Sequence, residues 1–462
     1  MRGRTRDRRV YLAGHPILFA LLVATRRWPA LRLGGTVLVH GRDAYVAALT
    51  RVPLDRTADG TTGGAAGRLG GADTFFDQQG DAHRRTRRST AEALGAAGVD
   101  RLRPVWTEIL ARRLAPLAAG AEVDLVPLAA ELSGSTAAAL LGLPVDGSAL
   151  AEAARDAGAG AVREHLPGLF RGRARRAAAA AAERLTTLIA PEGGAEAGRA
   201  AMLAVAAINT SVAALPRAVA WCADDDLWSY ARSHPRSLAT ELLRVTAPAP
   251  LLPRVAAAQS ILPTGCPADD NHRPARTPPT GCPTGGGRRA VPTNTPPTRS
   301  PTSGSGPATT TDTPPAGYSG HRDGRAGSAD AQPTGYPGKG RTGAQLRIRR
   351  GDRLLLVARH AVGAHRDDPD PAEPATAQVA QLVFGIGPHA CPGARLARTQ
   401  LVDLLMALAP YRPVVVRSRA DRRAALPGWR SLVVRASAAP VDAVGPPART
   451  TAPPDRTAEP GA

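Results

Sequence analysis

The stretch from Phe384 to Arg398 constrains the fold of this chain more than any other part of the sequence. It places one cysteine, Cys391, among glycines at positions 385, 387 and 393. Glycine lets the backbone adopt positive φ angles and approach a flat ligand closely. After Gly393, leucines at positions 396, 401, 404 and 405 predict the apolar stripe of a helix. A cysteine just before a helix N-terminus lies in a positive field, which favours the thiolate form that binds metals.

The residues around Cys391 also fill a known motif. Its pattern is Phe, two residues, Gly, one residue, His or Arg, one residue, Cys, one residue and Gly. Phe384, Gly387, His389, Cys391 and Gly393 match this pattern without a gap, so the loop resembles the cysteine-ligand loop of the cytochrome P-450 family. The resemblance implies that Cys391 ligates the iron of haem b (iron protoporphyrin IX), where a thiolate favours O–O cleavage. The alternative interpretation is a structural cysteine in a glycine turn.

Two further segments match positions that hold the haem propionates in that family. His83 and Arg87 are four residues apart in a predicted helix and therefore share a face. Alone, this pair indicates a solvated basic face, but it resembles the family's His-x-x-x-Arg pair. By the same resemblance, Arg254 meets the second propionate and His389 also contributes.

The apolar run 201–221 resembles the long central helix that crosses the haem face in the family. Within it, Thr210 fits the alcohol that handles protons on the distal side, and Asn209 replaces the usual acid. An amide cannot relay a proton as a carboxylate does, so we expect poorly coupled oxygen activation. Pro216 lacks an N–H and is expected to kink the helix. The alternative is a buried helix with a polar pair at a bend.

Glu241 and Arg244 resemble the Glu-x-x-Arg pair that the family buries behind the haem, and we interpret them as structural. In the family a third residue, an arginine, completes this group. Residues 371–381 contain no arginine. Without this third residue, the stability of the region is in doubt.

Residues 263–344 differ in character from the rest of the chain. These 82 residues contain 15 Pro and 15 Gly, and no Leu, Ile, Phe, Met or Trp. Such a segment cannot bury enough apolar surface to order itself, so we predict a disordered insert. It falls where the family has a small β-hairpin, and a neutral spacer is the simplest interpretation. The four cysteines are too scattered to indicate a disulfide framework or a zinc site.

Charge and hydropathy limit the classes of partner. The formal net charge of +20 is carried almost entirely by arginine, but no basic-aromatic interleaving indicates nucleic acid. The basic residues 1–9 precede eight apolar residues, 17–24, which are too few to span a bilayer. We expect a first amphipathic helix there, no membrane partner, and a cytoplasmic monomer.

Elements outside these motifs follow from local pattern. The expected helices are 42–49, 99–117 and 126–141, and the expected strands are 36–41, two within 346–357, and 409–425 and 427–435. Residues 57–71 are expected to form a loop.

Together these observations predict a mainly α fold with small β-sheets (α+β), the cytochrome P-450 fold, with haem between a long central helix and the cysteine loop. Residues 1–262 and 345–437 form the two parts of the catalytic domain, and 438–462 form a loose tail. The resemblance implies a haem-thiolate monooxygenase that inserts one oxygen atom from O2 into a small organic substrate of specialised metabolism. A separate ferredoxin-type donor and its reductase would supply electrons. The alternatives are a peroxide-driven peroxygenase of the same fold, or a catalytically silent haem-binding protein that recruits or regulates another enzyme.

Overall fold

The computed structural model describes residues 2–61, 63–65, 67, 80–165, 171–192, 194–264, 345–387 and 390–437. The chain divides into two units, residues 1–271 with 343–462 and residues 272–342, and every described residue belongs to the first. The predicted insert lies outside the described residues from position 265 onward, and so does the predicted tail 438–462.

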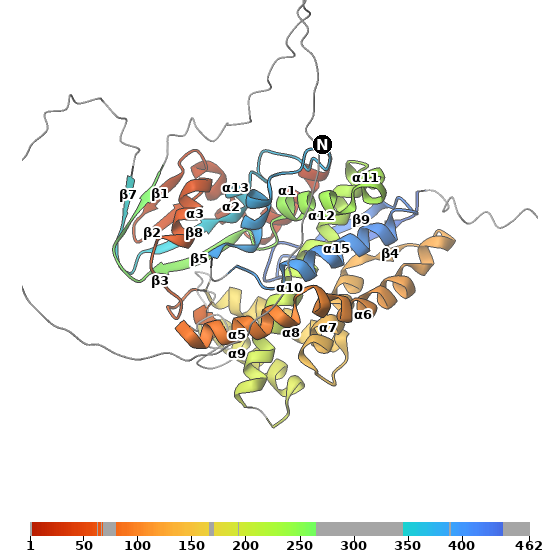
Figure 1. Ribbon diagram of the computed structural model, residues 1–462, viewed down its shortest axis with the longest axis horizontal. Coiled ribbons are helices and arrows are strands. Elements are labelled where there is room, and N and C mark those ends of the chain that lie inside the picture. The colour runs from red at the N-terminus through yellow and green to blue at the C-terminus, as the bar shows by residue number, and fades with distance from the viewer. Residues whose placement is uncertain are drawn as a thin grey trace, which may run out of the picture. The chain divides into compact units, whose positions relative to one another are not determined.

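The described residues are mainly helical (Figure 1). The helices are α1 (Arg2–Gly14), α2 (Pro16–Thr25), α3 (Arg42–Thr50), α5 (Gly80–Ala93), α6 (Ala96–Leu114), α7 (Leu125–Leu141), α8 (Gly147–His165), α9 (Arg171–Ile189), α10 (Ala195–Asp224), α11 (Trp228–Ser233), α12 (Pro235–Thr246), α13 (Ala358–Ala361), α14 (Ala377–Gln381) and α15 (Ala394–Leu408). Two 3₁₀ helices, η1 (Ala115–Ala119) and η3 (Leu382–Phe384), extend this set. The predicted helices at 42–49, 99–117 and 126–141 are therefore confirmed within a few residues.

The central helix α10 organises the helical core. It runs for 30 residues, continues through Pro216, and packs against α7, α8, α9 and α12. Three fully buried tryptophans, Trp106, Trp221 and Trp228, fill the space around it. The part from Glu196 to Asp224 is long and apolar enough to cross a membrane, but 61% of its apolar window is buried inside this protein. The apolar character of this helix is therefore explained by its burial in the core.

The helix after the cysteine loop packs as its sequence predicts. In α15, Leu401, Leu404, Leu405 and Leu408 are all buried against the helical core. Their spacing of three and four residues keeps them on one face, which is turned toward α6 and α12. This packing fixes the position of the loop that leads into the helix.

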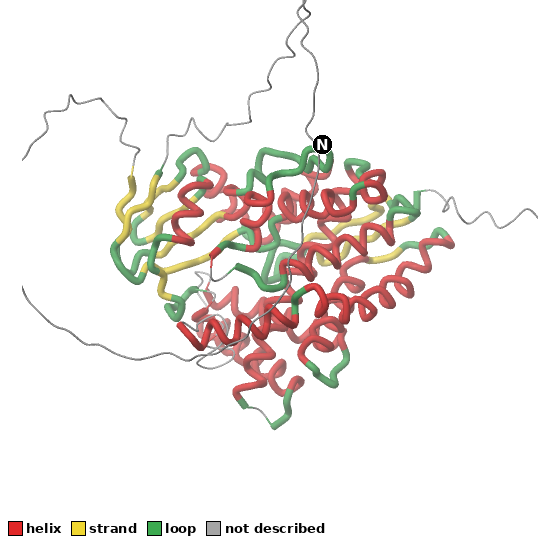
Figure 2. The backbone as a smooth tube through the Cα atoms, viewed as in Figure 1, coloured by secondary structure: helices red, strands yellow, loops and turns green. Residues whose placement is uncertain are grey.

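Strands gather in two separate groups beside the helices, with a third pair at the edge (Figure 2). The strands are β1 (Ala30–Leu33), β2 (Thr36–Val39), β3 (Leu54–Asp55), β4 (Val123–Asp124), β5 (Leu251–Ala256), β6 (Ser260–Pro263), β7 (Gln345–Ile348), β8 (Arg353–Val357), β9 (Val414–Ala420) and β10 (Trp429–Arg435). One sheet has the order β1-β2-β8-β5-β3, with β2 and β8 parallel and the other pairs antiparallel. The others are β4-β10-β9 and β6-β7.

The two strands expected within 346–357 are present, but they join different sheets. β7 pairs with β6, whereas β8 pairs with β2 and β5. The turn between them passes through Gly351 at φ +83°, a conformation that favours glycine. Asp352 holds this turn because its carboxylate accepts hydrogen bonds from Arg349 N and from the Arg32 guanidinium.

The N-terminal helices differ from expectation. α1 was not predicted, and α2 is not amphipathic in the usual sense, because its outer side is also apolar. Ile17 and Leu21 are exposed, whereas Phe19 and Leu22 are buried. The sequence from Pro16 to Ala24 contains no polar residue. Every side of this helix is therefore apolar, including the side that faces solvent.

Candidate functional site

The cysteine loop is a compact turn that depends on two glycines. Gly385 and Gly387 both have φ +73°, a region that residues with a Cβ rarely adopt. The turn closes where Cys391 N donates to Phe384 O at 2.7 Å, and Ala390 N donates to Gly387 O at 3.1 Å. The chain then enters α15. The loop thus presents Cys391 just ahead of a helix N-terminus, as the sequence predicts.

The thiol of Cys391 is influenced by the positive charges of Arg87 and Arg398. Burial raises its pKa above the ordinary value, whereas the Gly393 N–H and the charges of Arg87 and Arg398 lower it. Cys391 is exposed as a residue, although burial is the largest influence on the pKa of its thiol. A thiolate at this position is favoured by both guanidinium groups.

Arg87 extends from α5 to the cysteine loop. Its Nη2 donates to Ala390 O at 2.6 Å, while its buried Nη1 has no hydrogen-bond partner among the described residues. Burial lowers the pKa of Arg87, and the negative charge of Cys391 as a thiolate opposes that change. An unpaired buried guanidinium nitrogen is costly, so this site is suited to a ligand that carries an anionic oxygen.

Arg398 fixes the other side of the loop. Its guanidinium carbon lies 4.6 Å from the ring centroid of Phe384, and its Nη2 donates to Gln381 Oε1 at 3.1 Å. Gln381 Nε2 in turn donates to Gly385 O at 3.3 Å. Arg398 belongs to the Leu-Ala-Arg that follows the motif, but its contact with the loop emerges only in the folded chain.

Arg254 is a second centre of positive charge and interacts electrostatically with both Arg56 and Tyr45. Burial, followed by the charge of Arg254, lowers the pKa of Arg56 to about 10. Burial also lowers the pKa of Arg254, and Tyr45 opposes this. An anion between the two guanidinium groups would relieve their repulsion. The sequence singles out Arg254, but not Arg56 or Tyr45, because neither belongs to a recognisable local pattern.

These features fit haem. Cys391 supplies the soft sulfur ligand that haem iron accepts, and arginines with buried guanidinium nitrogens suit the two propionates of the cofactor. The orphaned Nη1 of Arg87 is the observation on which this fit depends most.

Two predicted propionate ligands fall outside what the structure describes. His83 lies in α5, one turn before Arg87, but its side chain is not among the described ones. His389 lies outside the described residues. Their roles stay predictions.

Asn209 and Thr210 lie in α10, and their hydrogen bonds end on α10 and α8. Asn209 Nδ2 donates to Ala154 O at 3.0 Å and to Val205 O at 2.9 Å. Thr210 Oγ1 donates to Ala206 O at 2.9 Å. Gly158 of α8 makes room for this amide, since a Cβ there would lie 2.7 Å from Asn209 Nδ2. A proton-handling role for either residue stays a prediction.

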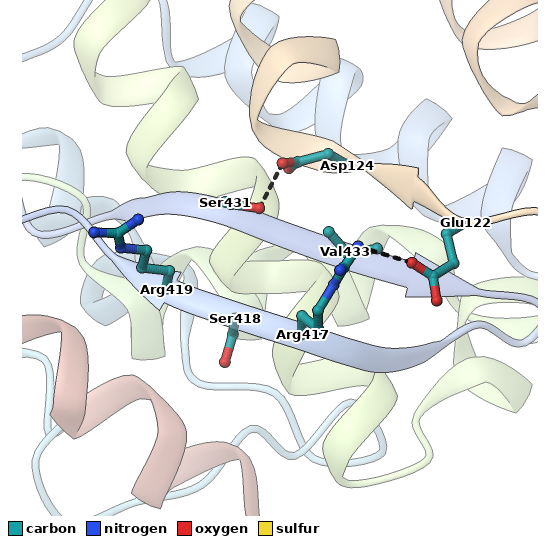
Figure 3. Close-up of a pocket in the computed structure, with 7 residues that line it drawn as sticks. All are labelled: Glu122, Asp124, Arg417, Ser418, Arg419, Ser431 and Val433. Carbon is teal, nitrogen blue, oxygen red and sulfur yellow. Dashed lines mark hydrogen bonds and ion pairs between the residues drawn. The ribbon is translucent and has the colours of Figure 1, made fainter.

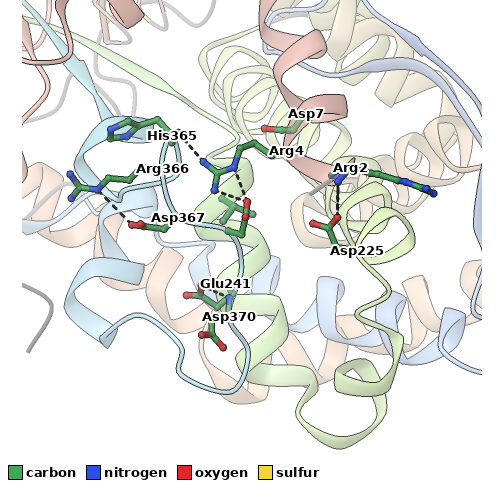
Figure 4. Close-up of polar contacts among 12 residues, drawn as sticks. Arg2, Arg4, Asp7, Asp225, Glu241, His365, Arg366, Asp367 and Asp370 are labelled. Atoms are coloured by element: carbon green, nitrogen blue, oxygen red, sulfur yellow. Dashed lines mark hydrogen bonds and ion pairs between the residues drawn. The ribbon is translucent and has the colours of Figure 1, made fainter. Parts of the chain in front are cut away.

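The buried pair Glu241 and Arg244 of α12 has a full set of partners without a third arginine. Arg244 binds Glu241 through Nε and Nη2 and donates to Val362 O and Asp368 O. The remaining capacity of the Glu241 carboxylate is filled by two backbone donors, Asp370 N at 3.1 Å and Ala375 N at 2.9 Å (Figure 4). Two amide hydrogen bonds therefore complete the Glu241 carboxylate without a further arginine.

A hollow of about 720 Å³ lies on the β4-β10-β9 sheet (Figure 3). Its polar groups pair with one another, because Arg417 Nη2 donates to Glu122 Oε2 and Ser431 Oγ donates to Asp124 Oδ2. None of the predicted site residues lines it. We therefore assign the candidate site to the cysteine loop, where the charge is unpaired, and not to this hollow.

Solved structures of bacterial cytochromes P450 resemble this chain. The open, histidine-tagged P450 EryK from S. erythraea is 17% identical, with a TM-score of 0.60, and the match covers 93% of this chain and 98% of that one. CYP108D1 from Novosphingobium aromaticivorans is 18% identical, with a TM-score of 0.58 and coverages of 91% and 94%. P450BioI, solved with an acyl carrier protein that carries hexadec-9Z-enoic acid, is 15% identical, with a TM-score of 0.58 and coverages of 92% and 98%.

The chain therefore has the cytochrome P450 fold, and the predicted fold class is confirmed. No protein-family model matches the sequence, and no curated protein matches it.

Proposed function

We propose that this protein is a haem-thiolate monooxygenase that inserts one oxygen atom from O2 into a small organic substrate. The observation that carries the proposal is the loop of Cys391, an exposed residue whose thiol is influenced by the charge of Arg87. The buried Nη1 of Arg87 has no hydrogen-bond partner among the described residues. A separate ferredoxin-type partner with its reductase would supply the electrons.

The chain's own residues would bind and orient the cofactor. Cys391 would ligate the iron, with its thiolate favoured by Arg87, Arg398 and the Gly393 N–H. Arg87 and Arg254 would hold the propionates, with His83 and His389 as further predicted ligands. When bound, haem supplies the iron at which dioxygen is activated, and the thiolate donates electron density that favours O–O cleavage.

Thr210 and Asn209 are the candidates for proton handling on the distal side of the cofactor, away from Cys391. The hydroxyl of Thr210 can exchange its helix hydrogen bond for a substrate or water, because Ser and Thr bonds to the i−4 carbonyl are weak. Asn209 has no titratable proton and can only orient a water through Oδ1.

Ligand screening tests the substrate class. Structure neighbours include a mutant of EryK in complex with erythromycin B and P450BioI with a fatty acid on acyl carrier protein. Macrolides and carrier-bound fatty acids are therefore the first ligands to screen, through shifts in the haem Soret band.

Replacing Cys391 with His tests the central assignment. The reduced, CO-bound protein should lose the red-shifted absorption band of a haem thiolate, because histidine gives a neutral nitrogen ligand. The matched control is Cys222→Ala, since Cys222 is the other described cysteine and is fully buried in α10. Survival of the band in Cys391→His, or its loss in Cys222→Ala alone, would contradict the assignment.

A peroxide-driven peroxygenase is the second candidate. Both amide hydrogens of Asn209 bind main-chain carbonyl oxygens, and no acid stands at this position. This favours a route that needs no proton relay to dioxygen. Turnover with hydrogen peroxide, compared with turnover by a ferredoxin and reductase at equal substrate conversion, separates the two functions.

A further inference from the structure

Exposed large apolar side chains are concentrated near the N-terminus. Among the ten such residues in the described structure, six lie between positions 12 and 33. They are Leu12, Ile17, Leu21, Val23, Trp28 and Leu33, with exposed fractions of 45%, 85%, 40%, 43%, 36% and 42%. Three of the six lie in α2, so this helix is the centre of an apolar surface that no other described residue covers.

We call this surface the α2 face and define it by the exposed residues of that helix: Pro16, Ile17, Ala20, Leu21, Val23 and Ala24. Ile17, Leu21 and Ala24 follow the spacing of one helix side. The opposite side of α2 is anchored, because Phe19 and Leu22 pack with Tyr11, Leu38 and Val357. The ring centroids of Tyr11 and Phe19 lie 5.0 Å apart in an edge-to-face arrangement, which ties α2 to α1.

The chain around the α2 face is positively charged. Arg8, Arg9, Arg26 and Arg27 are all exposed. The one acid in residues 1–42, Asp7, is buried between Arg217 and Arg359 and does not offset them. Arg8 lies one turn before the exposed Leu12 in α1, and the two therefore share a helix side.

Trp28 lies just beyond the end of α2 and adds an interfacial side chain. The guanidinium carbon of Arg27 is 3.9 Å from its ring centroid. Tryptophan prefers the boundary between water and apolar media, because its ring is apolar and its N–H is polar. An arginine stacked on that ring would lie at the same boundary between water and the apolar medium.

We propose that the α2 face docks the protein on the surface of an anionic phospholipid bilayer. α2 has ten residues and is about 15 Å long, too short to span a bilayer but suited to lie in its interface. The apolar face would enter the acyl boundary while the arginines meet the phosphate groups. A second copy of the chain is a poor occupant, because the same positive charges would face each other. The inference goes beyond the proposed function and differs from the sequence expectation of no membrane partner.

Vesicle flotation of the full-length haem-loaded protein tests the proposal. One set of vesicles is phosphatidylcholine alone, and the other is rich in phosphatidylglycerol. Binding should occur to the second set and weaken with salt, because surface charges are screened. The double variant Ile17→Asp, Leu21→Asp should lower the partition coefficient at least tenfold. It removes roughly the transfer free energy of two buried aliphatic side chains. The matched control is Ile261→Asp, since Ile261 is 55% exposed on β6, far along the chain from α2.

A second pair of variants keeps the test decisive if the double variant fails to fold by circular dichroism. Arg8→Gln and Arg27→Gln should each weaken binding to the phosphatidylglycerol vesicles about fivefold. Three results would overturn the proposal: no binding by the unaltered protein, equal binding to both vesicle types, or binding that these variants leave unchanged. A dimer in light scattering that Ile17→Asp dissociates, without vesicle binding, would assign the α2 face to a second copy instead.

Discussion

The two described cysteines, Cys391 and Cys222, have thiols in different electrostatic environments. Cys222 is fully buried in α10, where burial raises the pKa of its thiol. Burial also raises the pKa of Cys391, but there two guanidinium groups and a backbone N–H oppose the shift. The two thiols therefore differ in local charge, because Arg87 of α5 and Arg398 of α15 lower the pKa of Cys391, whereas Asp225 adds to the rise at Cys222.

Asn209→Asp should destabilise the protein near neutral pH. Asn209 Nδ2 donates to two carbonyl oxygens, at 3.0 and 2.9 Å, and a carboxylate would place an oxygen against both. We expect a loss of about 1–3 kcal/mol in the free energy of unfolding at pH 7. The carbonyl oxygens would raise the pKa of the new acid, so the loss should vanish as pH falls and the acid regains a proton to donate.

Urea denaturation of the variant and the unaltered protein at pH 7 and pH 4 measures this difference. Equal stability at pH 7 would mean that the amide contacts are not retained in solution. If Asn209 instead occupies the proton-relay position, the same substitution should raise the product formed per electron supplied, as the sequence alignment predicts.

The first helix, α1, holds distant parts of the chain together through charged contacts. Arg4 donates to the Asp368 carboxylate and to His365 O (Figure 4), and Arg6 binds Asp224. Asp7 accepts from Arg217 Nε at 2.8 Å and from Arg359 Nη1 at 3.1 Å. The helix thus joins α10, α13 and the segment before α14.

Asp7→Ala should cost about 3–5 kcal/mol in the free energy of unfolding, because it leaves two buried guanidinium groups without their carboxylate. Chemical denaturation measures the loss. The control is Thr5→Ala, an exposed position in the same helix, which should change stability by less than about 0.5 kcal/mol. A similar small effect for both variants would show that α1 is detached in solution.

Three histidines from two segments of the chain meet in a largely buried cluster, and they are expected to make the whole molecule sensitive to acid. His40 Nδ1 lies 2.8 Å from His360 Nδ1, and the rings of His360 and His365 have centroids 4.6 Å apart. Burial lowers the pKa of His40 to about 4. Burial, with neighbouring positive charges, lowers the pKa of His360 to about 2 and of His365 to about 3.

Stability should therefore fall as pH drops below about 6.5, where the unfolded histidines bind protons and the folded ones do not. From pH 7 to pH 5 we expect a loss of about 1–2 kcal/mol per histidine, and the trend should continue toward pH 4. Urea midpoints across this range measure it. His360→Gln should flatten the slope, whereas His234→Gln, at an exposed position, should not. A slope that His360→Gln leaves unchanged would place the acid sensitivity elsewhere.

The fold also offers a simple test of the predicted insert. Pro263 of β6 pairs with Gln345 of β7, so the chain leaves and re-enters at adjacent strand positions. Deleting residues 265–342 and closing with a short glycine turn should preserve the haem-thiolate spectrum, with a change in unfolding free energy within about 1 kcal/mol. Loss of haem on deletion would show that these residues support the cofactor site.

Local patterns in the sequence were sufficient for several elements. The glycine loop at Cys391, the apolar stripe of α15 and a helix over the apolar run 201–221 were all predictable. Each depends on residues within a few positions of one another, because periodicity and turn chemistry act over one or two helical turns.

Other features depended on contacts between residues far apart in the chain. Backbone N–H groups of Asp370 and Ala375 satisfy Glu241, where the sequence indicates only a missing arginine. β7 and β8 join different sheets, and α1 is held by carboxylates more than 200 positions away. A sequence pattern records which groups can bind, but the partner of a buried polar group is decided only when folding brings distant segments together.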